Sequence, residues 1–165
     1  MNKNNFVIRE AKEMDAPEML ELIRKHERHD KKFAKRYYQK YFSGDKITKE
    51  DTVFVAENDG EIVGMIGYCN DYLTTDYSYW IGWLVVAEEF RGVDDGFVAR
   101  ELLGKIESAL KAYEVNRLFV STEDGNSQAM SFYIKHGFKF EARLRDYYYE
   151  GEDQIILSKW FSDAP

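Results

Sequence analysis

Short apolar segments with strand-like spacing recur along the chain, and turn-forming residues separate them. In each segment β-branched and aromatic residues alternate with polar ones or run together, which is typical of strands. The clearest pair is a hairpin, because Asn58-Asp59-Gly60 is a strong turn signal between two such segments. The pattern predicts seven strands, over Phe6–Arg9, Thr52–Glu57, Glu61–Cys69, about Tyr77–Val86, Arg117–Thr122, about Phe138–Tyr147 and Gln154–Phe161.

Between these segments the apolar residues recur at helical spacing. Asp15 and Glu18 have the spacing of a capping box, so we expect a helix to begin at Asp15. A second helix is predicted over Lys31–Phe42, with a stop at Gly44. Two more helices are predicted, a long one whose inward face carries Leu103, Ile106 and Leu110, and one over about Ser127–His136 that Gly137 ends in a left-handed conformation.

The order of these elements is a strand, two helices, three antiparallel strands, a helix, a strand, a helix and two strands. This order predicts an α+β fold in which the sheet is the continuous element. The chain has 165 residues, of which 44% are hydrophobic and 16% aromatic, which is enough for one packed core. Because no repeat, low-complexity tract or Pro/Gly/Ser linker interrupts it, we expect residues 1–165 to form a single domain.

Composition and charge narrow the classes of function. No run of about 18 apolar residues is present, so no membrane span is expected. The polar start of the chain lacks a signal-peptide apolar region and Cys69 is the single cysteine, which together favour a cytoplasmic protein. The net charge of −7 disfavours general nucleic-acid binding. Residues 24–40 nevertheless carry a net +6, against −13 for the rest, so an RNA-associated role stays an alternative.

Two motifs carry candidate chemistry. In "WLVVAEEFRG" an apolar strand runs into an arginine-glycine turn before a helix, and such a helix start is a typical phosphate site. The second motif, Asn-x-x-Ala-x-x-Phe-Tyr-x-x-x-Gly-Phe, covers residues 126–138. Together with the preceding hairpin, these motifs resemble the GNAT superfamily, the acetyl-CoA-dependent N-acetyltransferases, over essentially the whole chain from Phe6 to Phe161. The late segment "RLRDYYYEGEDQIILSK" is similar, more weakly, to the tail of ribosomal-protein N-terminal acetyltransferases.

The resemblance implies a fold and a cosubstrate. The fold is a single GNAT-like domain with a central mixed, mostly antiparallel sheet, splayed fourth and fifth strands, and helices on both faces. Acetyl-CoA would lay its pantetheine amides along the strand edge that the splay exposes, and its pyrophosphate at a helix N-terminus. No metal is implied. The implied cofactor-binding residues are Leu84, Val85, Val86, Arg91, Gly92, Gly96, Phe97, Asn126 and Tyr133.

The phosphate-binding turn departs from the family pattern Arg/Gln-x-x-Gly-x-Gly/Ala. An ungapped alignment from Arg91 puts Asp94 where the first glycine belongs, whereas the face of the following helix puts the Gly/Ala position at Ala99. The two registers differ by three residues, which indicates an insertion between Arg91 and Gly96. Asp94 and Asp95 can cap the helix or, if they point inward, repel a phosphate by roughly 1–4 kcal/mol. An active N-acetyltransferase and a catalytically weakened binding module of the same fold both stay open.

Acetyl transfer to an amine needs a proton donor for the leaving thiolate and either a base or a neutral amine. The resemblance assigns the proton donor to Tyr133. In ribosomal-type relatives, a glutamate five positions before the equivalent of Asn126 serves as the general base. This chain has Ser121 at that position. Glu123 is the nearest substitute, with Asp76 behind it. A water relay, or an amine that arrives neutral, would need no carboxylate.

The acceptor site of this family lies between the first two helices and the last hairpin. Phe33, Tyr37 and Tyr41 stand four apart on the second predicted helix. They either dock as an aromatic stripe on the core or, with the tyrosines at 147–149, line an acceptor pocket. The acidic bulk suits a cationic acceptor amine, such as a polyamine, an aminoglycoside or a basic N-terminus. A homodimer through strand edges is a further expectation.

The three histidines are not predicted to take part in the chemistry. His26 and His29 are three apart, but no third metal ligand accompanies them, so we expect both to be solvated. His136 lies in the last turn of its predicted helix, where a cation is favoured, and is expected to be structural.

Overall fold

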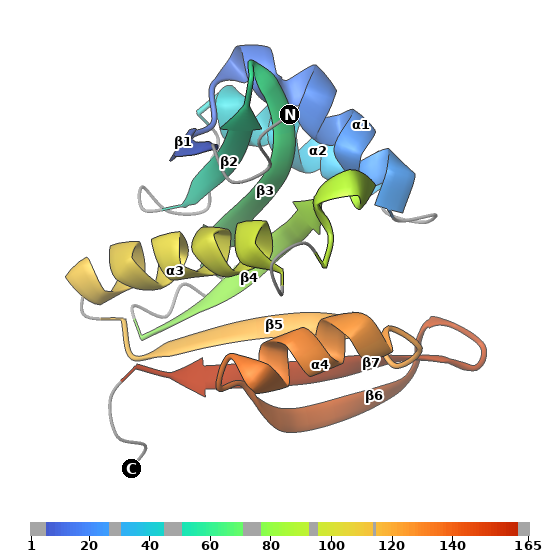
Figure 1. The fold of residues 1–165 in the computed structure, drawn as a ribbon. Coiled ribbons are helices and arrows are strands. Elements are labelled where there is room, and N and C mark those ends of the chain that lie inside the picture. Colours follow the sequence, from blue (N-terminus) through green and yellow to red (C-terminus); the bar gives the residue numbers. More distant parts are fainter. Residues whose placement is uncertain are drawn as a thin grey trace.

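Seven strands form one mixed sheet in the order β1-β2-β3-β4-β5-β7-β6 (Figure 1). The computed structural model of the chain describes residues 6–26, 31–44, 51–70, 77–92, 96–113 and 115–161. Neighbouring strands pair antiparallel, except that β4 and β5 are parallel. The strands are β1 (Val7–Glu10), β2 (Thr52–Asn58), β3 (Glu61–Cys69), β4 (Ser78–Val86), β5 (Arg117–Glu123), β6 (Lys139–Tyr149) and β7 (Glu152–Trp160).

Helices cover both faces of this sheet, as the first view of the fold shows (Figure 1). Side chains alternate between the two faces along a strand, so each strand contributes to two separate cores. In β2, for example, Phe54 and Ala56 belong to one core and Val53 and Val55 to the other. The helical elements are η1 (Glu13–Asp15), α1 (Ala16–His26), α2 (Lys31–Phe42), η2 (Glu88–Phe90), α3 (Phe97–Ala112) and α4 (Ser127–Lys135).

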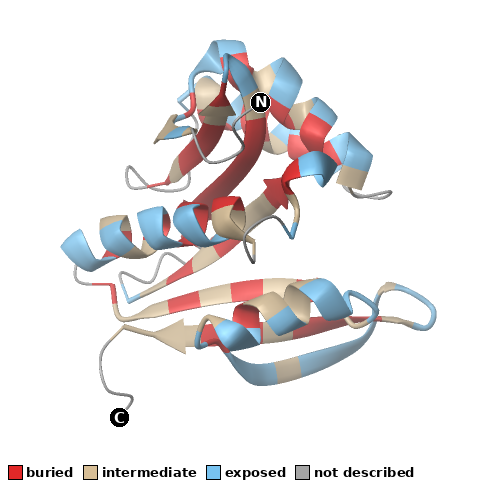
Figure 2. Cartoon of the chain, in the orientation of Figure 1, coloured by how far each residue is buried: buried red, intermediate tan, exposed pale blue. Residues whose placement is uncertain are grey.

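The larger core lies between the sheet and the layer of α3 and α4. Buried residues recur along α3 at helical spacing and pack on β2, β3 and β4. Tyr133 of α4 belongs to the same core as Leu118 and Val120 of β5 and Ile155 and Leu157 of β7. Figure 2 shows that the outer surfaces of α3 and α4 remain exposed. This layer therefore positions the N-terminus of α3 and one face of α4 above the junction of β4 and β5.

The second core lies between α1, α2 and the opposite face of β2, β3 and β4. Its most buried members include Met19 and Ile23 of α1, and Tyr38 of α2. The aromatic stripe predicted for α2 is rotated by about one residue, because Tyr38 and Tyr41 are buried whereas Phe33 is 66% exposed. The Tyr41 hydroxyl accepts a hydrogen bond from the backbone N–H of Val53 at 3.2 Å, so Tyr41 holds α2 on the sheet.

A helix begins directly after Asp15, as its spacing predicted, but Asp15 and Glu18 bind other partners instead of forming a capping box. Asp15 ends the short turn η1, and its carboxylate accepts hydrogen bonds from Arg9 at 2.6 and 2.9 Å and from the backbone N–H of Lys12 at 2.7 Å. Glu18 accepts instead from the backbone N–H of Ile62 at 3.1 Å. Arg9 is a stronger partner than a backbone N–H of the first helical turn, since both groups of the pair are charged.

The predicted fold class is confirmed. The sheet is mixed and mostly antiparallel, its fourth and fifth strands are the parallel pair, and helices lie on both faces. Gly137 ends α4 with a φ of 89°, in the left-handed region. In the part of the chain that the structure describes, no helix is long and apolar enough to span a bilayer.

Candidate active site

The two central strands, β4 and β5, part soon after they meet. Their pairing covers three positions, from Ser78 opposite Arg117 to Trp80 opposite Phe119. Beyond Trp80, β4 stays paired with β3 and β5 stays paired with β7. An irregularity in β4 follows the parting, where two residues, Trp83 and Leu84, oppose one residue of β3. Such a bulge bends and twists a strand, which leaves β4 with an edge inside the sheet.

Val86 presents its backbone to this internal edge. The N–H of the next residue, Ala87, donates to the carbonyl of Val63 in β3 at 2.8 Å. Backbone groups of successive strand residues point to opposite sides, so the N–H and carbonyl of Val86 point away from β3 and into the gap beside β5. An extended ligand could add to the sheet at this position as a further strand does.

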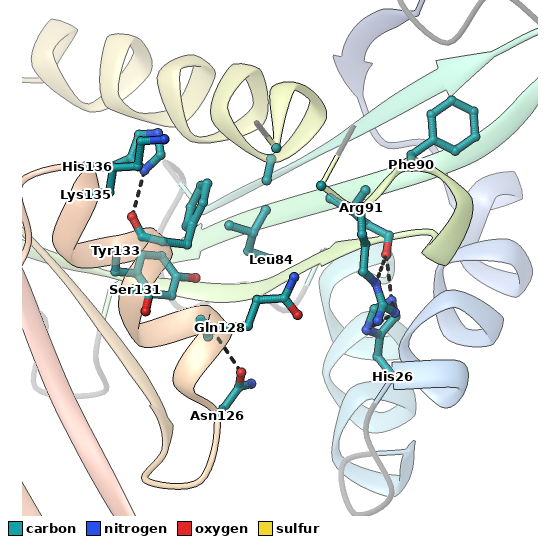
Figure 3. Close-up of a pocket in the computed structure, with 16 residues that line it drawn as sticks. His26, Leu84, Phe90, Arg91, Asn126, Gln128, Ser131, Tyr133, Lys135 and His136 are labelled. Atoms are coloured by element: carbon teal, nitrogen blue, oxygen red, sulfur yellow. Dashed lines mark hydrogen bonds between the residues drawn. The ribbon is translucent and has the colours of Figure 1, made fainter. Parts of the chain in front are cut away.

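A cleft of about 500 Å³ opens at this edge. Figure 3 shows its walls, with α4 on one side, the end of α1 on the other, and the start of α3 above. The residues that line it come from α1, β4, η2, α3 and α4, and they are His26, Leu84, Val86, Phe90, Arg91, Gly92, Gly96, Ala99, Asn126, Gln128, Ala129, Ser131, Phe132, Tyr133, Lys135 and His136.

The N-terminus of α3 forms one end of the cleft. Gly96 precedes the helix with a φ of 77°, and Gly92 has a φ of 66°, both in the left-handed region that favours glycine. Ala99 in the first turn also lines the cleft and leaves room there. A helix of this length offers its first backbone N–H groups and the positive end of its dipole to an anion.

The opposite wall is one face of α4. Asn126 caps this helix, because its side-chain oxygen accepts from the N–H of Ala129 at 3.0 Å. Tyr133 is 6% exposed, and its ring makes edge contacts with Phe132 at 5.4 Å and with Phe138 at 5.2 Å between ring centroids. At the end of the helix, Nδ1 of His136 is hydrogen-bonded to the carbonyl of Phe132 at 2.7 Å. These contacts fix the orientation of Tyr133 within the cleft wall.

The end of α1 contacts the cleft through His26, and the prediction that this residue is solvated was wrong. Nε2 of His26 lies 2.7 Å from the Val86 carbonyl, which also accepts from Nε of Arg91 at 2.9 Å. The Arg91 guanidinium contacts the His26 ring directly. Burial, together with the nearby cation of Arg91, lowers the pKa of His26 below its ordinary value, which favours the neutral ring. His29 lies outside the described residues.

Most of the cofactor-binding residues expected from the sequence meet in the cleft, namely Leu84, Val86, Arg91, Gly92, Gly96, Asn126 and Tyr133. The structure places three expected site residues elsewhere. Val85 pairs with Met65 and its side chain lies in the second core, while the Phe97 ring packs edge-on against Phe6 at 5.4 Å. Glu123 is exposed at the end of β5 and is not part of the described cleft lining. Asp76, Asp94 and Asp95 lie outside the described residues.

Five polar residues of the cleft were not predicted as site residues, namely His26, Gln128, Ser131, Lys135 and His136. Gln128, Ser131 and Lys135 lie on α4, three and four positions apart, and His136 directly follows the helix. Helical periodicity counted from Tyr133 would have found His136, three positions on, but not the other three. His26 had no such signal, because its partner Arg91 is 65 positions away in the sequence.

Comparisons with known proteins agree with this geometry. The acetyltransferase (GNAT) family model matches residues 12–138, so the chain belongs to this family. A curated relative from Sulfurisphaera tokodaii, an N-alpha-acetyltransferase, is 29% identical over 130 residues, which cover 73% of this chain and 77% of the relative.

Two solved structures share the fold at low sequence identity. The ribosomal-protein-S18-alanine N-acetyltransferase of Escherichia coli has a TM-score of 0.75 at 17% identity and covers 98% of this chain and 97% of its own. An aminoglycoside 6'-N-acetyltransferase complexed with coenzyme A has a TM-score of 0.74 at 16% identity, with 96% and 99% covered. At these identities the likeness shows the fold alone.

Proposed function

We propose that this protein is an acetyl-CoA-dependent N-acetyltransferase that transfers an acetyl group to a primary amine by direct attack. The observation that carries the proposal is the backbone of Val86, which faces an internal strand edge beside the N-terminus of α3. An extended amide chain that ends in a pyrophosphate matches both features of the cleft. Membership of the acetyltransferase (GNAT) family supports the same conclusion.

The residues present fit coenzyme A. The pantetheine amides would pair with the N–H of Val86 and, after displacement of Arg91 or His26, with its carbonyl, beside the apolar side chain of Leu84. The pyrophosphate finds the first N–H groups of α3, next to the left-handed Gly92 and Gly96. Lys135 adds a cation to the lining of the same cleft.

Two side chains are proposed to move protons. When bound, acetyl-CoA supplies an activated acetyl thioester. The hydroxyl of Tyr133 is the proton donor proposed for the leaving sulfur, since its ring is fixed in the cleft wall. Glu123 is the base proposed for the amine. Thr122 is buried next to it and strand residues alternate, so Glu123 belongs to the other sheet face and the acceptor would meet it there.

The acceptor is proposed to bind on the sheet face that carries α1 and α2. In the described residues these helices pack on the β2–β4 part of the sheet, and β5, β6 and β7 carry no helix on that side. Aromatic rings gather where the covered part ends, with Trp83 5.4 Å from Tyr37 and Trp80 stacked on Phe119 at 4.9 Å. Aromatic rings suit a protonated amine. An amine of a small molecule, a protein N-terminus and a lysine side chain all meet this description.

Titration calorimetry with acetyl-CoA and coenzyme A tests the cofactor part of the proposal. We expect binding, and a dissociation constant weaker than about 1 mM for both ligands would contradict it. Acetyl transfer is then followed as release of free coenzyme A thiol in the presence of candidate acceptors. The panel contains a peptide with a free N-terminus, an N-terminally blocked peptide with one lysine, a polyamine and an aminoglycoside.

The alternative of a catalytically weakened binding module depends on where Asp94 and Asp95 point, and both lie outside the described residues. Binding of acetyl-CoA without transfer to any amine of the panel would favour that alternative. Absence of binding in the wild type, restored by replacing both aspartates with glycine, would favour it as well.

A further inference from the structure

The Val86 carbonyl is the acceptor that an extended ligand would need at the internal edge, and the protein's own side chains occupy it. A carbonyl oxygen has two lone pairs. One faces Nε of Arg91 at 2.9 Å and the other faces Nε2 of His26 at 2.7 Å. A further N–H donor would therefore have to displace one of these two side chains.

The His26 ring connects the two contacts into one unit. For Nε2 to donate to the Val86 carbonyl, the neutral ring must carry its proton on Nε2, which leaves Nδ1 with a lone pair. The Arg91 guanidinium contacts both nitrogens of the same ring, and of the two only the unprotonated Nδ1 can accept a hydrogen bond from it. In this tautomer His26 donates to Val86 and accepts from Arg91, while Arg91 also donates to Val86. We call this three-membered contact the His26 clasp.

The clasp joins two segments that are far apart in the sequence. His26 is the last residue of α1, whereas Arg91 follows η2 and precedes α3. Figure 3 shows the Arg91 side chain extended toward His26, on the side of the cleft opposite Asn126 and Gln128. In this conformation Arg91 contacts α1 and the end of β4.

We propose that His26 sets the affinity of the cofactor cleft by holding Arg91 on the Val86 carbonyl, where both compete with the pantetheine amide of coenzyme A. This inference rests on the proposed function, because it takes coenzyme A as the ligand of the cleft. His26, the last residue of α1, would thus act on the cofactor through Arg91. Release of the clasp frees the carbonyl for the cofactor amide and frees the guanidinium for the phosphates.

Two substitutions at His26 separate competition from packing. His26→Leu keeps a side chain of similar bulk but can neither donate to Val86 nor accept from Arg91. His26→Gln keeps both abilities in one amide group. One hydrogen bond corresponds to about 0.5–1.5 kcal/mol, so we expect His26→Leu to bind coenzyme A about two- to tenfold more tightly than the wild type. His26→Gln is expected to bind like the wild type.

Titration calorimetry with coenzyme A measures these affinities, and circular dichroism confirms that each variant is folded. The same leucine substitution in an Arg91→Leu background should change the affinity less, because His26 is proposed to act through Arg91. Nitrogen-15 NMR of the imidazole provides a readout independent of binding heats. We expect the neutral Nε2–H tautomer of His26 in the ligand-free protein, and a change of the His26 signals on addition of coenzyme A.

Unchanged or weaker binding by His26→Leu, with the wild type still binding, would overturn the inference and leave the proposed function intact. A His26 signal with the proton on Nδ1 in the ligand-free protein would overturn it too. Failure of every variant and of the wild type to bind coenzyme A would overturn the proposed function, and this inference with it.

Discussion

At the scale of single residues, Tyr133 is the side chain whose chemical role is easiest to isolate. Its ring is fixed by Phe132 and Phe138, and the substitution Tyr133→Phe removes the hydroxyl alone. If the hydroxyl protonates the leaving sulfur, kcat should fall by about 10²-fold or more while the dissociation constant for coenzyme A stays unchanged. Steady-state kinetics with the best acceptor of the panel, and calorimetry of the same variant, measure the two quantities.

The unfolding temperature of Tyr133→Phe serves as the control for packing. A fall in kcat smaller than about tenfold would remove Tyr133 from the role of proton donor. A matching loss of affinity for coenzyme A would indicate that the hydroxyl supports the cleft rather than the reaction.

His26 should make the stability of the protein depend on pH in a defined direction. Its pKa is lowered by burial and by Arg91, while the Val86 carbonyl and Glu88 act in the opposite sense. The unfolded chain therefore takes up a proton more readily than the folded one. The stabilising contribution of the neutral ring is present above the unfolded pKa of about 6.5 and is lost as the pH falls below it.

We therefore expect the free energy of unfolding to fall more steeply with acidification in the wild type than in His26→Gln, which does not titrate. Urea denaturation on either side of the unfolded-state pKa measures the difference. The other titrating groups are common to both proteins and cancel in the comparison. Equal slopes would show that His26 is protonated to the same extent in both states.

Local sequence patterns could predict some residues of the cleft that belong to one element, and they failed for residues that act across elements. Asn126 and Tyr133 are seven positions apart on one helix, so a motif within a helix describes both. Gly92 and Gly96 were identifiable because a left-handed backbone requires glycine. His26 meets Arg91 only after α1 has docked on the sheet, and nothing in the residues around His26 records that contact.

At the scale of elements, the packing of α3 on β3 depends on a glycine. A Cβ atom added to Gly64 would lie 3.0 Å from Cδ1 of Leu102, 3.1 Å from Cγ1 of Val98 and 3.4 Å from the carbonyl oxygen of Val85. We expect Gly64→Ala to lower the free energy of unfolding by about 1–3 kcal/mol, because α3 has to move away from the sheet. Urea denaturation measures the change.

Gly104 provides the matched control in the same helix. It is exposed, and a Cβ atom there would have no neighbour within 4 Å. Gly104→Ala should raise the free energy of unfolding by about 0.5–1 kcal/mol, since alanine favours a helix interior over glycine. A Gly64→Ala protein as stable as the wild type would show that α3 is not held closely to β3.

The strands and helices were largely predictable because the spacing of apolar residues within each segment indicates its secondary structure. The hairpin at Asn58-Asp59-Gly60 and the helix stop at Gly137 depend on residues adjacent in sequence. The pairing of Asp15 with Arg9 and the burial of the Val85 side chain in the second core were not predictable in the same way. Arg9 donates hydrogen bonds to the Asp15 carboxylate from another element. The bulge at Trp83–Leu84 shifts by one residue which side chains of β4 face each side of the sheet.

At the scale of the whole molecule, two cores share the same strands. Val53 and Phe54 are neighbours in β2 yet belong to opposite cores. Unfolding of these strands would therefore disrupt both cores together. We expect the chain to unfold in one cooperative transition, as a single domain does. Ile23→Ala in the second core and Ile106→Ala in the larger core should each lower the free energy of unfolding by about 2–5 kcal/mol.

Far-UV circular dichroism and tryptophan fluorescence, followed in the same urea titration, provide the measurement. The two signals should coincide in the wild type and in both variants. Separate transitions, with Ile23→Ala moving one and Ile106→Ala the other, would show that the two layers unfold independently and that the chain is not one domain in the thermodynamic sense.

The internal edge of β4 also has a consequence for solubility. An unpaired strand edge is a template for a strand of another chain, and most proteins protect such edges with charge, twist or cover. Here the bulge twists β4 away, and the Arg91 cation with the His26 ring covers the carbonyl at its end. The contacts that restrain the cofactor would thus also restrain aggregation, so a chain that binds its cofactor more tightly through loss of His26 would be more prone to associate when the cofactor is absent.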